Sequence, residues 1–189
     1  MSGRPCAYTG SGVRSLAVSL RRLLRFLGEV QKVLERRVVL VAVGGTAMTL
    51  YKLKPSTIDV DFTGPAEDVA LFIRAVKRVQ PGFRVDAWPN GQVFSQFLPS
   101  DYLGMSHRIR RLGKIELMAL APVDIVITKL GRLDRRDLDD IKVCLGKFRM
   151  RKDVITRRGK RVEYAGNRRV FDHNLETVLG LLPERRRPG

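Results

Sequence analysis

Six apolar residues in a row, 38–43, end in the pair Gly44 and Gly45. The β-branched content of the run predicts a buried strand, and the glycines lead from it into a short helix over residues 46–53. A glycine turn between a strand and a helix start presents backbone N–H groups that can bind phosphate. Residues 44 and 45 are therefore the predicted phosphate-binding residues.

A second strand, with two acidic residues, follows the short helix. Pro55 ends that helix, and residues 57–62 alternate in polarity as a strand does. Because successive side chains point to opposite faces, Asp59 and Asp61 should share one face while Ile58, Val60 and Phe62 share the other. Two carboxylates about 6–7 Å apart along a strand can share a Mg²⁺ or Mn²⁺ ion that also binds triphosphate oxygens. The two strands together predict a site for a nucleoside triphosphate and its metal.

A two-metal site needs a third carboxylate on a neighbouring strand. Asp86 is the preferred candidate, because it lies in the middle of a strand expected over residues 83–88, and Glu116 in the alternating segment 114–120 is the reserve. The alternative for Asp86 is an ordinary solvent-facing strand residue. For Trp88, core packing is preferred over stacking on a base.

The remaining pattern predicts one α/β (α+β) domain, a mixed sheet flanked by helices, over residues 1–148. A basic, mostly helical extension over residues 149–189 should pack on that domain or extend it. An amphipathic helix with a basic side is expected over residues 13–36. Further expected elements are a helix from Gly64-Pro65 to Pro81, a fourth strand over 93–98, and helices over 122–130, 136–148 and 173–182.

The net charge of +17 is unevenly distributed along the chain. Residues 1–37 contribute +6 and residues 147–189 contribute +8, whereas residues 38–146 contribute only +3. Basic flanks around a nearly neutral centre are typical of a protein that binds a polyanion, with RNA or DNA the first candidate. The alternative is an arginine-rich surface without such a ligand, as thermophile proteins carry.

The sequence disfavours disulfide-bonded, zinc-binding, membrane-spanning and secreted proteins. Cys6 and Cys144 have neither disulfide nor zinc spacing. No segment approaches ~18 uninterrupted apolar residues, and no signal peptide or lipidation motif accompanies the charge. We expect a cytoplasmic protein with reduced thiols and no membrane partner.

Two blocks of residues stand out along the chain. The first block is Gly44-Gly45-Thr46-Ala47 with Lys54-x-Ser56-Thr57-x-Asp59-Val60-Asp61-Phe62, and the second is Pro122-x-Asp124-Ile125-Val126-Ile127-Thr128-Lys129-Leu130 with Arg135-Arg136-Asp137-Leu138-Asp139-Asp140-Ile141. These blocks resemble motifs of the DNA polymerase beta-like nucleotidyltransferase superfamily, and more narrowly those of toxin-type prokaryotic nucleotidyltransferases from abortive-infection and toxin–antitoxin systems. The resemblance spans roughly residues 38–148.

The resemblance implies a nucleotidyltransferase fold and a role for each matching residue. Asp59 and Asp61 would hold Mg²⁺, and Lys129 would contact the triphosphate or help to activate the nucleophile. The acidic member of the last motif would be Asp137 or Asp140. The predicted nucleotide-binding residues are Gly44, Gly45, Thr46, Lys54, Ser56, Thr57 and Asp140.

This chain departs from the family pattern at two positions. Many members have Gly-Ser where it has Gly-Gly, so Thr46 would have to supply the hydroxyl group. Lys54 stands where an arginine is often found, which replaces a bidentate fork by a point charge. Neither departure removes a predicted metal ligand.

The resulting hypothesis is Mg²⁺-dependent transfer of a nucleoside monophosphate from an NTP to a hydroxyl group of RNA, such as a tRNA, or of a protein. A partner protein of the toxin–antitoxin type is a further expectation. One alternative is a catalytically silent fold that serves as an RNA-binding or antitoxin-like module. Another is a haloacid-dehalogenase-type phosphatase, because residues 59–63 match its Asp-x-Asp-x-Thr motif. For Asp137 and Asp140 the alternative is a solvated helix face, and for Lys129 a snorkelling side chain.

Overall fold

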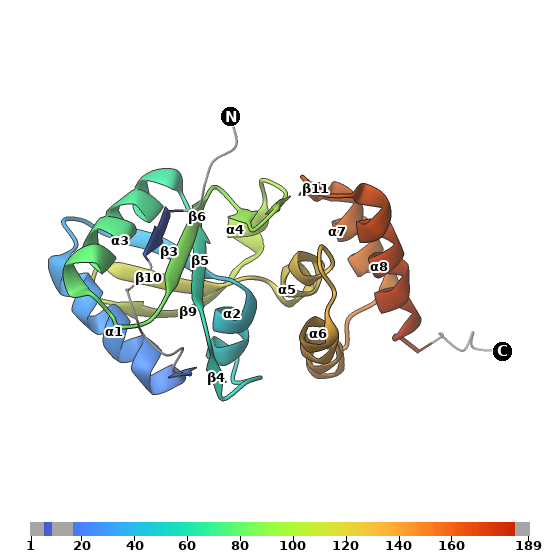
Figure 1. Cartoon of the computed structure of the whole chain (residues 1–189), viewed down its shortest axis with the longest axis horizontal. Helices are drawn as coiled ribbons and strands as arrows, with labels where there is room; N and C mark the ends of the chain where they lie inside the picture. The colour runs from blue at the N-terminus through green and yellow to red at the C-terminus, as the bar shows by residue number, and fades with distance from the viewer. Residues whose placement is uncertain (1–5, 9–16, 184–189) are drawn as a thin grey trace.

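The centre of the molecule is a mixed six-stranded sheet, which confirms the predicted α/β class (Figure 1). The computed structural model describes residues 6–8 and 17–183. Strands β5 and β6 are parallel, as are β3 and β10, whereas β3 and β5 run antiparallel. The strand order is β1 (Cys6–Tyr8), β6 (Val85–Pro89), β5 (Val60–Gly64), β3 (Val38–Ala42), β10 (Ile115–Ala119) and β9 (His107–Leu112).

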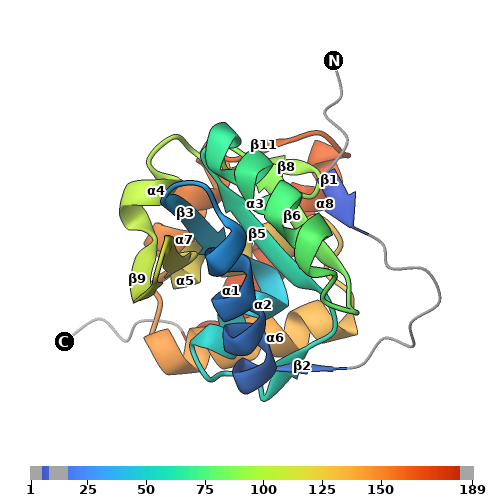
Figure 2. The same cartoon turned by 90° about the vertical axis from the view of Figure 1, so that its left-hand side faces the viewer.

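Helices cover both faces of this sheet. Helices α1 (Leu20–Val33) and α3 (Ala66–Val79) lie together on one face and stand in front of the strands in Figure 2. Helix α2 (Gly44–Leu50) lies on the other face, followed outward by α5 (Pro122–Lys129) and α6 (Arg135–Phe148) (Figure 1).

Aromatic side chains hold α1 and α3 on the sheet. The Phe26 ring of α1 packs edge-to-face on Phe72 of α3 and on Phe83, with ring centroids 6.4 and 5.1 Å apart. Phe72 in turn packs on Phe62 of β5 at 5.2 Å. All four side chains are buried, and such pairs stabilise a core beyond the area that they bury. Strand β5, which carries Asp61, is therefore packed firmly against α3 on this face of the sheet.

The first helix differs from its predicted span. It begins at Leu20, because Ser19 acts as the N-cap and its side chain accepts a hydrogen bond from the Arg22 N–H at 3.3 Å. The preceding residues form β2 (Val18–Ser19), which pairs with β4 (Ser56–Thr57). The rest of the predicted helix start, residues 13–16, lies outside the described residues.

The predicted strand over residues 57–62 is also different, because it is broken in two. Strand β4 ends at Thr57 and β5 begins at Val60, with a bend at Ile58 and Asp59. The Thr57 hydroxyl donates to the Asp59 carbonyl at 2.8 Å, and such a local bond competes with strand pairing. As a result Ile58 is 48% exposed whereas Val60 and Phe62 are fully buried, and its predicted place on their face is wrong.

The predicted fourth strand over residues 93–98 is a hairpin of β7 (Gln92–Val93) and β8 (Gln96–Phe97). It is completed by β11 (Glu163–Tyr164), whose Tyr164 pairs with Gln96. The sequence pattern also missed β9, the short helix α4 (Tyr102–Met105) and helix α7 (Lys152–Arg161), while α8 (Arg168–Gly180) begins five residues before its predicted start.

The C-terminal extension packs on α5 through a buried ion pair. Arg158 of α7 is 4% exposed and Asp124 of α5 is fully buried. The Arg158 Nε and Nη2 atoms donate to the two Asp124 oxygens at 2.6 and 2.9 Å, and Nη1 donates to Asp101. This arginine is consequently structural and is not available to a polyanion. Among the described helices, none is long and apolar enough to cross a membrane.

Candidate active site

A cavity of about 610 Å³ lies between one end of the central sheet and helices α5 and α6. Its volume is typical of a site for a nucleotide-sized ligand. Its lining comes from segments that are far apart in the sequence. The predicted residues that line it are Gly44, Gly45, Lys54, Ser56, Thr57, Asp59, Asp61, Asp86, Lys129, Asp137 and Asp140.

Gly44 and Gly45 bring bare backbone to the cavity. Gly44 has a φ of +50°, which L-residues with a side chain rarely adopt. A Cβ atom at Gly45 would lie 2.5 Å from the Thr57 Oγ1 atom, so the close approach of these two segments requires glycine there. These residues start α2, where the N–H groups have no intrahelical acceptor.

Thr46 does not line the cavity, although it was predicted to contact the phosphates. Its side chain is fully buried, and its hydroxyl group accepts a hydrogen bond from the Asp61 N–H at 2.9 Å. The same hydroxyl donates to the Asp59 carbonyl at 3.3 Å. Thr46 therefore fixes the backbone of the acidic segment and leaves no hydroxyl group for a ligand.

The three predicted carboxylates lie near one another but differ in their surroundings. Asp61 of β5 and Asp86 of β6 are register partners on parallel strands, so their side chains emerge on the same face. They are 7% and 2% exposed, whereas Asp59 lies in the bend before β5 and is half-buried. The structure thus brings Asp86 beside Asp61.

Burial and mutual repulsion perturb these acids. Burial first, then the charges of Asp86 and Asp59, raise the pKa of Asp61 from 3.8 to about 7, against the opposing charges of Arg84 and Lys129. Burial also raises the pKa of Asp86, although the Arg84 guanidinium opposes it. A carboxyl group whose pKa is raised to about 7 by burial and by neighbouring acids is frequent in functional sites.

Arg84 occupies one oxygen of Asp86. Its Nε atom lies 2.7 Å from Oδ2, while Oδ1 is buried and has no hydrogen-bond partner. No preformed cluster of three or more metal-ligating side chains exists among the residues that the structure describes. The donors nevertheless fit a hard cation. The buried Asp86 Oδ1 has no hydrogen-bond partner, and a cation bound to it would also reduce the repulsion among the carboxylates of Asp86, Asp61 and Asp59.

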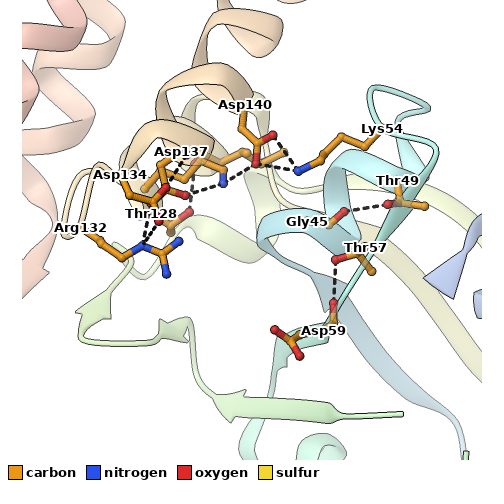
Figure 3. A network of polar contacts seen from close by, with 12 residues as sticks. Gly45, Thr49, Lys54, Thr57, Asp59, Thr128, Arg132, Asp134, Asp137 and Asp140 are labelled. Atoms are coloured by element: carbon orange, nitrogen blue, oxygen red, sulfur yellow. Dashed lines mark hydrogen bonds and ion pairs between the residues drawn. The ribbon is translucent and has the colours of Figure 1, made fainter. Parts of the chain in front are cut away.

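The opposite wall of the cavity is an ion-pair network that α5 and α6 build (Figure 3). The Lys129 Nζ atom, at the end of α5, lies 3.0 Å from Asp137 Oδ1 and 2.7 Å from Asp140 Oδ2. Lys54 reaches across from the α2–β4 loop to Asp140 Oδ1 at 2.9 Å. Arg132 Nε pairs with Asp137 Oδ2 at 3.0 Å. The predicted lysine and both candidate acids of the last motif therefore form one network.

Charge pairing favours the ionised forms of Lys129 and Asp137. Burial lowers the pKa of Lys129, but its bonds with Asp140 and Asp137 outweigh burial, so the pKa is raised overall. Burial raises the pKa of Asp137, but Arg132 and Lys129 more than offset that effect and lower it. The solvated-helix alternative does not describe Asp137 and Asp140, because both side chains are buried against Lys129.

Glu116, the reserve third carboxylate, lies elsewhere. It is on β10, bonds to Arg108 of β9 at 2.9 Å, and lines a different, smaller cavity. Sequence reasoning missed several residues of the main cavity. Arg84 precedes Asp86 by two positions on the same strand face, a signal that could have identified it. The other missed lining residues include Phe94, Gln96, Arg132 and Arg136.

The two basic flanks lie at opposite ends of the molecule, with α1 at one end and α7 and α8 at the other (Figure 1). Several of their cations are already paired. Arg161 bonds to Asp101 at 2.8 Å, and Arg168 bonds to Asp172 at 2.9 Å. Arg136 of α6 is exposed and lines the cavity.

Comparison with known proteins gives one family-level match. The model of the family described as "Nucleotidyltransferase of unknown function (DUF6036)" matches residues 19–145, which run from the N-cap of α1 to near the end of α6. No curated protein and no solved structure matches the chain. Every predicted site residue lies within the matched segment, and α7, β11 and α8 follow it.

Proposed function

The chain belongs to the family of nucleotidyltransferases of unknown function (DUF6036), and on this basis we propose that it transfers a nucleoside monophosphate from an NTP to a hydroxyl group, with RNA as the first acceptor. The observation that carries the proposal is the pairing of Asp61 and Asp86 across β5 and β6, facing the glycine backbone of residues 44 and 45 in one cavity. In this arrangement the glycine N–H groups would bind phosphate oxygens and the carboxylates would bind the metal ion of the same triphosphate.

The carboxylates of Asp59, Asp61 and Asp86 would hold Mg²⁺ or Mn²⁺, which would neutralise negative charge on the triphosphate when it is bound. The N–H groups of Gly44 and Gly45 would donate to phosphate oxygens. Thr57 and Thr46 keep this geometry, because their hydroxyl groups fix the backbone of Asp59. Ser56 lies beside them and lines the same cavity.

The cations of the ion-pair network would bind the β- and γ-phosphates, which leave as pyrophosphate. Lys129, Lys54 and Arg132 already pair with Asp137 and Asp140, so a bound phosphate would share their donors. Such a network holds the cations in place before the ligand arrives, and this preorganisation favours charge stabilisation in the transition state. In this scheme Asp140 is a positioning residue for Lys129 and Lys54.

The chemistry balances with the groups that are present. The acceptor oxygen bonds to the α-phosphorus, the bond from the α-phosphorus to the bridging oxygen breaks, and pyrophosphate leaves. The acceptor proton passes to solvent water, because Asp86 Oδ1, the oxygen that has no protein partner, is the one assigned to the metal ion.

The phosphatase alternative is not supported by this geometry. Its motif places the two aspartates where a strand ends, whereas here Asp59 precedes β5 and Asp61 is its second residue. The family assignment also points away from it. The catalytically silent module and the toxin-type role with a partner protein stay as proposals that activity measurements can separate.

Two labelled substrates test the proposed reaction. With total RNA, Mg²⁺ and an NTP labelled at the α-phosphorus, the wild-type protein should label RNA, whereas a label at the γ-phosphorus should leave as pyrophosphate. Asp59→Asn/Asp61→Asn should abolish labelling, and Asp139→Asn, an exposed acid of α6 outside the cavity, should not.

Each other outcome identifies a different function. Label found only in protein would overturn the RNA acceptor and favour a protein hydroxyl group. Release of inorganic phosphate from the γ-position without α-label transfer would favour a phosphatase. RNA binding that weakens with salt, in the absence of any transfer, would favour the silent module.

A further inference from the structure

We propose that Phe94 is the stacking platform for the base of the bound nucleotide, which defines a nucleobase subsite in the cavity. The inference rests on the proposed function and assigns the part of the substrate that the phosphate and metal residues leave unbound. Phe94 lies at the tip of the β7–β8 hairpin and lines the cavity. Its side chain is 52% exposed.

Most other residues that line the cavity have charged or polar side chains, or are glycines. Of its residues, only Ile58 and Phe94 have large apolar side chains, and both are about half exposed. A nucleotide has one charged end and one flat apolar ring system, and the charged groups of the cavity can account for the charged end. An aromatic face is the usual partner of the ring system, because every base has a π-face.

The backbone at Phe94 is strained in a way that glycine would avoid. Residues 94 and 95 form the two-residue tip of the hairpin, and Phe94 has a φ of +54°. The first position of such a tip favours glycine, and a bulky L-residue there is an outlier. The chain therefore places an aromatic side chain where local structure disfavours one, and such strain concentrates at functional sites.

Trp88 packs against the Phe94 ring and links it to the strand that carries Asp86. The Phe94 and Trp88 ring centroids are 4.8 Å apart, and Trp88 is only 3% exposed. Trp88 follows Asp86 by two residues on β6, so their side chains share a face about 6–7 Å apart along the strand. The platform consequently lies within one nucleotide's reach of the predicted metal ligands.

Two further contacts fix the hairpin in the cavity wall. The Gln96 side-chain amide donates to the Thr128 carbonyl at 2.9 Å, which ties the hairpin to α5 just before Lys129. The Ser95 carbonyl accepts from the Ala165 N–H at 2.9 Å, next to the β8–β11 pairing. The extension beyond the family match thus supports the platform, and a fixed ring binds a base at low entropic cost.

The test compares nucleotides with a probe that lacks a base. Calorimetric titrations with Mg²⁺ would use ATP, GTP, CTP, UTP and inorganic tripolyphosphate. We expect Phe94→Ala to weaken binding of the preferred NTP about tenfold or more, and binding of tripolyphosphate by less than twofold. Phe94→Tyr should keep most of the NTP affinity, because it keeps the aromatic face.

Phe97→Ala is the matched control. Phe97 is on the same hairpin, is 43% exposed and does not line the cavity, so its removal should change neither affinity. Unchanged melting temperatures would show that each variant is folded. Equal NTP affinity in the wild type and Phe94→Ala would overturn the platform while leaving nucleotide binding intact.

Two other results would also overturn the assignment, each in its own way. If NTP affinity holds in Phe94→Ala but affinity for a single-stranded RNA oligonucleotide falls tenfold, Phe94 stacks on the acceptor and not on the NTP. If the wild type binds neither NTP nor tripolyphosphate, the proposed function fails and the subsite fails with it.

Discussion

Asp61 and Asp86 face the same cavity from adjacent parallel strands, as direct register partners, with little solvent to separate their charges. Burial first, and the charge of Asp86 second, raise the pKa of Asp61 to about 7, which is a cost to folding when the group is ionised. Buried carboxylates that repel each other are typical of a site that binds a cation or transfers a proton.

Asp61→Asn should stabilise the free protein above neutral pH. A carboxyl group whose folded pKa is raised from 3.8 to about 7 favours folding in its protonated form, so that stability is lost as the pH rises through that interval. The difference in unfolding free energy between the variant and the wild type should grow from near zero at pH 4 to at most about 4 kcal/mol at pH 8. Urea unfolding at several pH values measures it, and a difference that does not change with pH would contradict the assignment.

Gly45→Ala should destabilise the protein through Thr57. The new Cβ atom would lie 2.5 Å from Thr57 Oγ1, and overpacking of this kind costs about 1–3 kcal/mol. Thr57→Ala alone should cost about 1 kcal/mol, because it loses the bond to the Asp59 carbonyl. The double variant should be more stable than the sum of the two single changes predicts, and a thermal double-mutant cycle measures that coupling. Strict additivity would show that the two residues do not meet.

Lys129→Met should weaken both stability and transfer. It would leave Asp137 with Arg132 and Asp140 with Lys54 as their remaining cations, and the loss of the charged hydrogen bonds should cost about 1.5–3 kcal/mol. Adding Asp140→Asn should restore part of the stability but none of the transfer, if Lys129 contacts the triphosphate. Urea unfolding and α-label transfer separate the two effects. Transfer that recovers with stability would reduce Lys129 to a structural residue.

Arg158→Met should destabilise the whole chain by about 3–5 kcal/mol, because it leaves the fully buried Asp124 unpaired. The double variant with Asp124→Leu should recover much of that loss. Since Asp124 is in α5, the single change should also lower NTP affinity. Chemical unfolding followed by titration of the folded fraction checks both effects. A single variant of wild-type stability would show that the extension packs on α5 by other means.

The local patterns around residues 38–62 predicted much of the site, because they depend on short-range rules. Alternation and glycine turns indicated the strand, the turn and the two aspartates. The same rules failed at Ile58, where side-chain bonds to the Asp59 carbonyl bend the chain. Asp86 was found from its place in a strand, but its pairing with Asp61 depends on sheet order, which no local pattern specifies.

Long-range contacts explain the remaining differences. Whether Thr46 would face the cavity or the backbone of the acidic segment depended on how α2 sits against β5. Phe94 gave no signal, because an exposed aromatic residue in a tight turn breaks the usual preferences. Arg158 read as part of a basic tail, yet its partner Asp124 is 34 positions away in the chain. Sequence charge alone could not separate a buried ion pair from a surface patch.

Metal-dependent nucleotide binding tests the central claim most directly. Calorimetric titration of Mg²⁺ and NTP into the wild type should show a saturable site that disappears without Mg²⁺. Asp59→Asn/Asp61→Asn should abolish it, while the control Asp139→Asn should bind as the wild type does. Binding that survives in the double variant, or that is absent from the wild type, would contradict the assignment of Asp59 and Asp61 as the residues that hold the metal-bound triphosphate.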